Sequence, residues 1–239
     1  MSKFICDDSF WGLFPEAAIG VVVLKDLNNS DDVYTKHPEI MDELKNANVT
    51  AKKYLVTEPL SECPVIKVWR EAFMKFKKKK DNRSSIEALL KRVEKGNEVG
   101  KINPLVDIYN ATSLIYGLPC GGEDIDSFVG NLRLTISEKG GDEFLALGDE
   151  ANDPTLPGEL CYLDDKGAVC RCWNWRDGQR TMLTEKTNKA FMILECVDSS
   201  RKEDLAKALD YLANKASMYL GAKVTAKVVL TKDNKEVEL

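Results

Sequence analysis

The chain has 239 residues, 44% of them hydrophobic, and its 34 basic and 39 acidic side chains give a formal net charge of −5 at neutral pH. These values suit a globular protein with a substantial core, and the acidic balance argues against a protein that coats nucleic acid through its overall charge. The sequence has no window of about 18 apolar residues and no basic, apolar and small-residue succession at its N-terminus, so we expect neither a membrane span nor a secretory signal.

The first predicted element is a buried strand. Residues 18–24, AIGVVVL, are a nearly continuous apolar run rich in valine, and the run is too short for an independent helix. The polar segment that follows holds the only histidine, His37, beside Pro38. We interpret His37 as a surface side chain, which gives little support to a histidine-based catalytic triad.

Two predicted helices then carry a basic segment. Pro64 stands at the first position of one helix, and the second begins after Ser84, which has Glu87 three residues on, as in a capping box. Residues 75–101 hold ten basic and four acidic side chains, so this segment is +6 while the rest of the chain is −11. Such a run indicates either a solvated face or a local contact with a polyanion.

A third helix is predicted over residues 103–116. Asn103 is a good cap, a proline follows it, and Gly117 is a stop signal. At 100° per residue Asn103, Asp107 and Asn110 share one narrow stripe of this otherwise apolar helix. These polar groups either brace neighbouring loops or face a substrate.

The C-terminal half is mostly strand in pattern, followed by one long helix. Between the strand-like segments stand Gly, Asp, Asn and Pro clusters, and a sheet of about five strands is expected. A capped helix from Ser200 to Gly221 and a final strand complete an α+β fold, expected as a single compact domain over residues 1–239 in which helix 103–116 packs on the sheet. The predicted strands of the sheet are 132–136, 143–147, 158–164, 168–175 and 190–197.

The run CRCWNWRDGQRT, residues 170–181, concentrates aromatic and cationic side chains. Strand alternation places Arg171 and the two tryptophans, Trp173 and Trp175, on one face, with Asn174 and Arg176 on the other. The tryptophans are the more hydrophobic set, so we expect them to pack, Asn174 and Arg176 to reach a ligand, and Arg171 to lie at the rim. An Asp-Gly pair at 177–178 supplies the residues of a hairpin turn.

Metal and nucleotide sites find no support in the motifs. The 7 cysteines are odd in number and irregularly spaced, which favours a reducing, cytoplasmic location. Cys170 and Cys172 lack the second ligand pair of a zinc site, and neither a GxGxxG after a strand nor a GxxxxGK[ST] occurs, so no metal and no cofactor are expected. Gly121 and Gly122 are the one place where the backbone could approach a ligand closely, the alternative being a plain loop.

Together these motifs carry a resemblance. The strings INPLVDIYN, GLPCGGED and RCWNWR, with Asp107, Asn110, Gly117, Pro119 and Asp124 in order, resemble the B3/B4 module of the phenylalanyl-tRNA synthetase β chain and, more closely, free-standing B3/B4-domain proteins. The similarity covers about residues 64–196. In the synthetase this module hydrolyses wrongly charged aminoacyl-tRNA in a pocket between the B3 and B4 subdomains. Where the family motif has a histidine this chain has Gly121, and a glutamate expected near the later hairpin falls close to Gln179.

Two classes of function follow from the resemblance, and the oligomeric state stays open under both. The first is a trans-acting deacylase of misacylated tRNA that meets the 3′ end of aminoacyl-tRNA; the second is a non-catalytic module that binds tRNA or an amino acid. Synthetase activity is not expected from this chain alone. In the deacylase, Glu123 or Asp124 would hold the attacking water and the Gly121 and Gly122 amides would stabilise the oxyanion.

The remaining expected roles are contacts with the substrate and with the tRNA backbone. The substrate-binding residues are expected to be Asp107, Asn110, Asn174, Arg176, Gln179 and Thr181. The tRNA backbone is expected to meet Lys77, Lys78, Lys79, Lys80 and Arg83.

Overall fold

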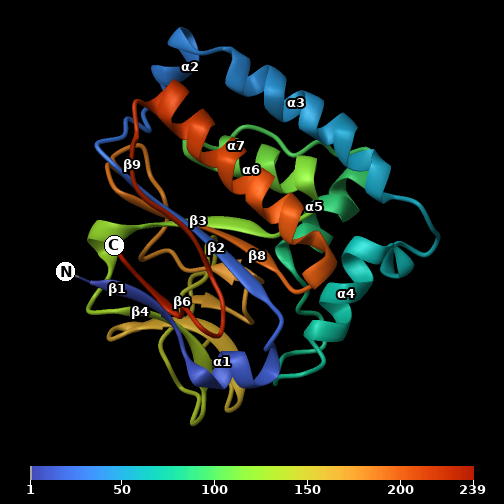
Figure 1. Cartoon of the computed structure of the whole chain (residues 1–239), viewed down its shortest axis with the longest axis vertical. Helices are drawn as coiled ribbons and strands as arrows, with labels where there is room; N and C mark the ends of the chain where they lie inside the picture. Colours follow the sequence, from blue (N-terminus) through green and yellow to red (C-terminus); the bar gives the residue numbers. More distant parts are fainter. Residues whose placement is uncertain (1) are drawn as a thin grey trace.

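Two β-sheets lie face to face in the computed structural model, which describes residues 2–239 (Figure 1). The strands found in this range are β1 (Lys3–Cys6), β2 (Ala18–Lys25), β3 (Cys120–Asp124), β4 (Leu132–Ser137), β5 (Glu159–Asp164), β6 (Gly167–Arg171), β7 (Arg176–Asp177), β8 (Ala190–Cys196), β9 (Lys223–Leu230) and β10 (Glu236–Glu238). One sheet has six strands in the order β10-β1-β4-β5-β6-β7, and the other has four in the order β3-β8-β2-β9. Every pairing is antiparallel except that of β1 with β4.

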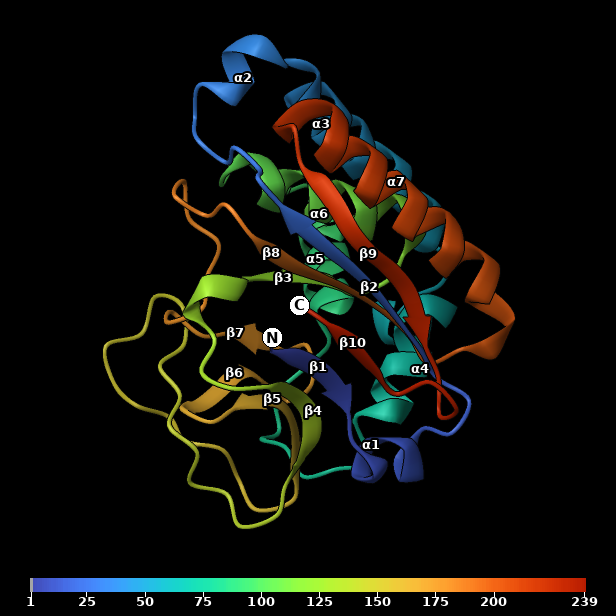
Figure 2. The same cartoon turned by 60° about the vertical axis from the view of Figure 1, so that its left-hand side comes forward.

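Helices cover the outer face of the four-stranded sheet, so the fold has a helical layer and two sheet layers (Figures 1 and 2). The α-helices of the described range are α1 (Asp8–Leu13), α2 (Val33–Lys36), α3 (Glu39–Ala51), α4 (Pro64–Ala72), α5 (Ser85–Glu94), α6 (Pro104–Tyr116) and α7 (Lys202–Leu220). Helix α6 packs against α3, α7 and β3, and α5 contacts both α3 and α6. No helix within residues 2–239 is both long and apolar enough to cross a membrane.

Strand β8 separates two hydrophobic cores. Its residues Phe191 and Ile193 belong to the cluster between the two sheets, whereas Met192 and Leu194 belong to the cluster beneath the helices. Alternation along a strand produces this division, because successive side chains point to opposite faces. Glu195 therefore lies on the side of β8 that faces the other sheet.

The α+β class is confirmed, and several predicted elements are found close to their expected bounds. Helix α6 begins after Asn103, whose side chain accepts a hydrogen bond from Val106 N at 3.1 Å. Helix α5 begins after Ser84, whose hydroxyl accepts from Glu87 N at 3.4 Å. The helix predicted from Ser200 begins two residues later, at Lys202.

The prediction of one sheet from residues 132–197 was wrong. Strand β8 pairs with β2 and β3 in the four-stranded sheet, whereas β4, β5 and β6 belong to the six-stranded one. Residues 143–147 form no strand, only an isolated bridge from Ala146 to Gly178. Strand β1, strand β3 and helix α3 were not predicted. Strand β3 contains Gly121 and Gly122, for which a loop was the alternative expectation.

The hairpin turn was also misplaced. Strand β6 ends at Arg171, and Cys172 and Trp173 have φ of 44° and 60°, in the left-handed region that L-residues rarely adopt. The turn therefore spans residues 172–175, and Asp177 pairs with Cys170 in β7. Trp173 is held by tertiary packing: it is fully buried, with rings of Phe10, Phe14, Trp69 and Phe76 around it.

Candidate functional site

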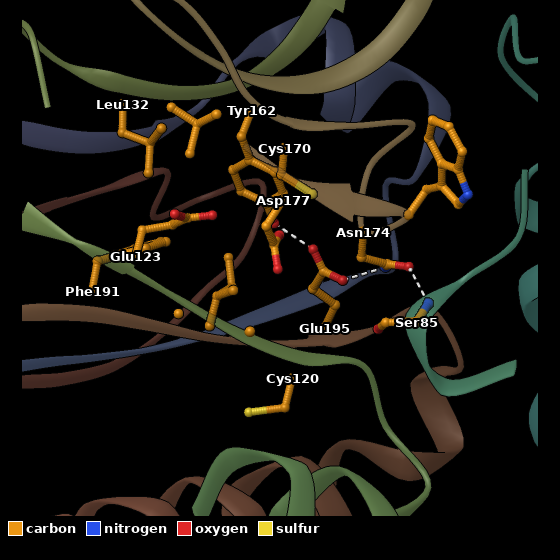
Figure 3. A pocket seen from close by; sticks show the side chains of 15 residues that line it. Ser85, Cys120, Glu123, Leu132, Tyr162, Cys170, Asn174, Asp177, Phe191 and Glu195 are labelled. Atoms are coloured by element: carbon orange, nitrogen blue, oxygen red, sulfur yellow. Dashed lines mark hydrogen bonds between the residues drawn. The ribbon is translucent and has the colours of Figure 1, made fainter. Parts of the chain in front are cut away.

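A cavity lies between the two sheets, near the turn that follows β6. Its volume is about 70 Å³, and its wall is formed by residues of both sheets and of the start of α5. Figure 3 shows its lining, which is mostly apolar with a few acidic and polar groups. The lining residues are Ser85, Cys120, Gly121, Gly122, Glu123, Leu132, Tyr162, Val169, Cys170, Asn174, Trp175, Asp177, Phe191, Ile193 and Glu195.

Three carboxyl groups reach this cavity from three strands. Glu123 comes from β3, Asp177 from β7 and Glu195 from β8. Glu123 and Glu195 are 5% and 1% exposed, and Figure 3 shows the Glu123 and Asp177 carboxyls turned toward the open space. Removal from water raises the pKa of all three groups, because burial penalises the charged form.

Glu195 is held by two hydrogen bonds. The Tyr162 hydroxyl donates to its Oε1 and the Asn174 amide donates to its Oε2, while Asn174 Oδ1 accepts from Ser85 N at 3.2 Å (Figure 3). Burial raises the pKa of Glu195 to about 7, and these donors oppose the rise. A carboxyl with this pKa exists in both protonation states near neutral pH, as a general base or acid requires.

Glu123 is less well satisfied than Glu195. Its Oε2 is buried and forms no hydrogen bond with any group in residues 2–239. The Thr181 hydroxyl lies near enough to oppose the rise in the pKa of Glu123, but no bond of ordinary geometry joins the two, and Thr181 Oγ1 also lacks a partner in the described range. Buried polar groups are normally paired, so these two atoms mark a place where a ligand or water belongs.

Basic side chains are absent from the cavity lining in the described part of the chain. Arg180 opposes the rise in the pKa of Glu123, but its guanidinium already donates to both oxygens of Asp164, at 2.8 and 2.7 Å. The cavity is thus an acidic and apolar space with no cationic side chain in its described lining.

Strand β3 presents its glycines to this space as the edge of the four-stranded sheet. Glu195 N donates to Pro119 O at 3.1 Å, and the alternation of an antiparallel ladder then directs the Gly121 N–H toward Ile193 and the Gly122 N–H toward the free edge. Of the two amides expected to stabilise an oxyanion, the sheet leaves only that of Gly122 free.

Several predicted site residues lie away from the cavity lining. Asp124 accepts from Thr187 Oγ1 at 2.8 Å and from Asp126 N at 3.0 Å, so its carboxylate stabilises the segment after β3. Asp107 is fully buried and accepts from Tyr34 OH and from Ile102 N. These bonds fit the alternative that the polar stripe of α6 braces loops. Asn110 is buried in α6 outside the lining.

Of the site residues predicted between 174 and 179, some line the cavity and others do not. Asn174 lines the cavity. Trp175 also lines it and packs against the core between the sheets. Arg176 pairs with Asp149 at 3.0 Å, and Gln179 Nε2 donates to Ala146 O and Asp149 O, so both hold the 144–150 loop.

Arg171 was expected at the rim and is instead fully buried. Its guanidinium donates to Glu159 Oε1 at 2.8 Å and Oε2 at 2.6 Å, and a further nitrogen lies 2.9 Å from Asp153 Oδ2. Arg171 is the last residue of β6, and its burial is possible because Glu159 and Asp153 pair with its charge.

The basic segment encloses a second hollow, of about 360 Å³, at the junction of α4 and α5. Lys78, Lys80 and Arg83 line it and form no ion pair within residues 2–239. Lys77 and Lys79 do not line it, and Lys79 pairs with Asp153 at 2.7 Å. Ser84 lines this hollow, and the next residue along the chain, Ser85, lines the cavity.

Sequence reasoning missed Glu195, Asp177 and Tyr162 as parts of the site. Glu195 had a readable signal, a carboxylate inside the apolar run AFMILEC, since a buried charge is seldom kept without a role. Asp177 was assigned to a turn. Within residues 2–239 no group of three or more His, Cys, Asp or Glu side chains is arranged to hold a metal ion.

Comparison with known proteins identifies a family and solved structures of similar fold. The B3/4 domain model matches residues 68–230. The crystal structure of an N-terminal fragment of the phenylalanyl-tRNA synthetase β-subunit from Pyrococcus horikoshii superposes with a TM-score of 0.53 at 11% identity, over 98% of this chain and 54% of that one. The chain thus spans about half the length of that fragment, and the likeness concerns the fold. No curated protein matches the sequence.

Proposed function

Because the chain belongs to the B3/4 domain family, we propose that it is a tRNA-associated protein that hydrolyses the ester bond of misacylated aminoacyl-tRNA. The observation that carries the proposal is that consecutive residues line two sites of opposite charge. Ser84 lines the basic hollow beside α4 and α5, and Ser85 lines the acidic cavity. The end of an aminoacyl-tRNA has the matching order, with anionic phosphates followed by a cationic aminoacyl group.

In this proposal the hollow binds the backbone of the acceptor end. Lys78, Lys80 and Arg83 are available for phosphates because no carboxylate in residues 2–239 pairs with them. An arginine and two lysines in a concave surface supply the sequence-independent, salt-dependent part of such binding. The aminoacyl group then extends past Ser85 into the cavity.

Glu195 is the proposed general base. As a carboxylate it takes a proton from a water molecule, the water oxygen attacks the ester carbonyl carbon, and the tetrahedral intermediate collapses by releasing the ribose oxygen, which takes the proton back from Glu195. The products are a free amino acid and tRNA with its hydroxyl restored. A pKa of about 7 suits this double role, and the two bonds from Tyr162 and Asn174 fix the carboxyl in place.

Other polar groups of the cavity support the same step. The Gly122 N–H is the amide that the sheet leaves free for the developing oxyanion. Since an aminoacyl ester is intrinsically labile, positioning a water and stabilising the oxyanion suffice without a nucleophilic side chain. This accounts for a site that has Gly121 where the family motif has a histidine.

A second function, binding without hydrolysis, is favoured by the contacts of Glu195. Both of its oxygens already accept hydrogen bonds, so the carboxyl could serve only to hold Tyr162 and Asn174 in place. A carboxylate has further lone pairs to offer a water, which is why we place hydrolysis first.

A turnover assay separates the two functions. The protein is incubated in catalytic amounts with tRNAs each charged with one amino acid, correct or incorrect, and the release of the amino acid is followed against the spontaneous rate. We expect multiple turnovers with at least one misacylated tRNA. Binding of charged tRNA with no release above the spontaneous rate would establish the binding module instead.

A further inference from the structure

The acidic side chains of the cavity indicate the charge of its ligand. Glu123, Asp177 and Glu195 face it, and within residues 2–239 the lining contains no lysine, arginine or histidine. Close carboxyl groups repel each other when ionised, and a bound cation relieves that repulsion. The cavity is therefore built for a positively charged group.

Glu123 has a carboxyl oxygen that no donor in the described chain satisfies. Its side chain is 95% buried, its Oε2 has no hydrogen-bond partner in residues 2–239, and its carboxyl is directed into the cavity (Figure 3). A buried acceptor of this kind calls for a donor from outside. An ammonium group has three N–H donors and a positive charge, which meets both needs.

The rest of the wall indicates what carries the ammonium group. It is apolar, so it suits a hydrocarbon side chain on the same small molecule. The space is small, at about 70 Å³, so a short side chain suits it better than a large one. The apolar lining residues are Leu132, Val169, Trp175, Phe191 and Ile193.

We propose that Glu123 and Asp177 bind the α-ammonium group of an aminoacyl ester, while Glu195 activates the water. All three carboxyl groups exclude the free amino acid, so that the cavity distinguishes the substrate of hydrolysis from its product. This inference rests on the proposed function. An aminoacyl ester is a monocation, and hydrolysis adds a carboxylate beside the ammonium group. That carboxylate faces three acidic side chains in a space of low dielectric, where like charges repel strongly. The product therefore leaves, and free amino acids in the cell do not occupy the site.

The test compares three ligand charges on one scaffold, by titration calorimetry on the whole protein. The probes are L-alaninamide and L-valinamide as cations that resist hydrolysis, alanine and valine as zwitterions, and the N-acetyl amides as neutral forms. The cations are expected to bind at least tenfold more tightly than the other two. Equal affinity for the amides and their N-acetyl forms would overturn the proposal, as would tighter binding of the free amino acids.

Two variants locate the effect. Glu123→Gln keeps the shape of the side chain and removes its charge, and we expect it to reduce the preference for the cation by tenfold or more while the protein melts no lower than the wild type. Glu150→Gln changes an exposed carboxylate outside the lining and is the matched control, expected to keep the full preference. A preference unchanged in Glu123→Gln and in the corresponding Asp177→Asn would also overturn the proposal.

Failure of this inference can be told apart from failure of the proposed function. If the protein hydrolyses N-acetyl-aminoacyl-tRNA as fast as aminoacyl-tRNA, hydrolysis stands and ammonium recognition is wrong. If it binds the amides selectively but hydrolyses no aminoacyl-tRNA, ammonium recognition stands and the deacylase is wrong.

Discussion

Two sets of buried charges lie side by side in this fold, and they differ in how completely they are paired. Arg171 and Glu159 are both fully buried and joined by two hydrogen bonds, and Glu159 also accepts from Cys172 N and Leu156 N, each at 2.9 Å. In the cavity, by contrast, Glu123 has an oxygen with no partner in residues 2–239. The first set is complete without a ligand, whereas the second is complete only with one.

The difference separates structural charge from functional charge. The Arg171–Glu159 pair closes the turn after β6 and so positions the residues that follow, Asn174 and Trp175, at the cavity. The pair is therefore needed for the fold, and the cavity carboxyls are needed for what the fold binds. Variants on each side of this division should fail in different ways.

The largest expected effect is on stability, in Arg171→Met. Methionine fills the same space but leaves Glu159 buried without its cation, which costs about 3–5 kcal/mol. We expect a large drop in the free energy of unfolding measured in urea. Arg176→Met is the matched control: it breaks a surface pair with Asp149 and should cost about 0–1 kcal/mol. Similar losses in the two variants would remove the structural role given to Arg171.

The next effect concerns the pH dependence of stability. The pKa of Glu195 is raised from 4.5 to about 7 in the fold, so the folded state holds its proton more tightly than the unfolded state. The stability linked to that proton is fully present below about pH 4.5 and is lost as the pH rises through 7, an effect of about 3 kcal/mol for the full shift. Thermal melting of the wild type should therefore decline between pH 5 and 8.

Glu195→Gln should flatten that decline, because glutamine does not titrate. Part of the slope should remain, since burial raises the pKa of Glu123 and Asp177 in the same direction. A variant with the same slope as the wild type would show that Glu195 keeps an ordinary pKa, and the site would lose its proposed base.

A smaller effect, on tRNA binding, is expected at the basic hollow, where lysines without an ion pair can be compared with a paired one. Replacing Lys78, Lys80 and Arg83 together with glutamine should weaken tRNA binding and reduce the slope of log K against log salt by roughly 2, at about 0.7 for each single-strand phosphate contact. Lys79→Gln, which removes a lysine already paired with Asp153, is the control and should change the slope little. Unchanged binding in the triple variant at low salt would make the segment a solvated face.

The smallest effect is expected at Gly121. A Cβ there would meet only Ile193 Cγ2, at 3.8 Å, which is an ordinary contact. Gly121→Ala should therefore fold normally and gain about 0.4–1 kcal/mol from a less flexible unfolded chain. Because Gly121 lines the cavity, the new methyl group should lower the affinity for amino-acid amides several-fold, as calorimetry would show. An affinity equal to that of the wild type would mean that the ligand lies elsewhere.

The sequence predicts those parts of the molecule in which local pattern and structure agree. Helix α6, with its Asn103 cap and its Gly117 stop, has the bounds that its signals indicate, and the capped α5 does as well. Of the expected site residues, Gly121, Gly122, Glu123 and Asn174 line the cavity, whereas Asp107, Asn110, Asp124, Arg176, Gln179 and Thr181 do not.

The remainder depends on contacts that no local pattern records. The pairing of Gly121 with Ile193 joins segments about 70 residues apart and turns an apparent glycine loop into a strand. Trp173 packs and Asn174 lines the cavity as expected. Two consecutive left-handed residues nevertheless break the strand alternation, so Trp175 also lines the cavity and Arg176 pairs with Asp149. Glu195 was missed since its partners, Tyr162 and Asn174, come from the other sheet and its turn.

The most direct test of the account is one variant measured twice. Glu195→Gln is compared with the wild type at pH 8 for its rate of hydrolysis of the misacylated tRNA that the panel identifies and for its melting temperature. We expect the rate to fall by a factor of about 10²–10⁴, the range for loss of a general base, while the protein melts at or above the wild-type temperature. Retained hydrolysis together with a lower melting temperature would contradict the account, because Glu195 would then belong with Arg171 and Glu159 among the structural charges.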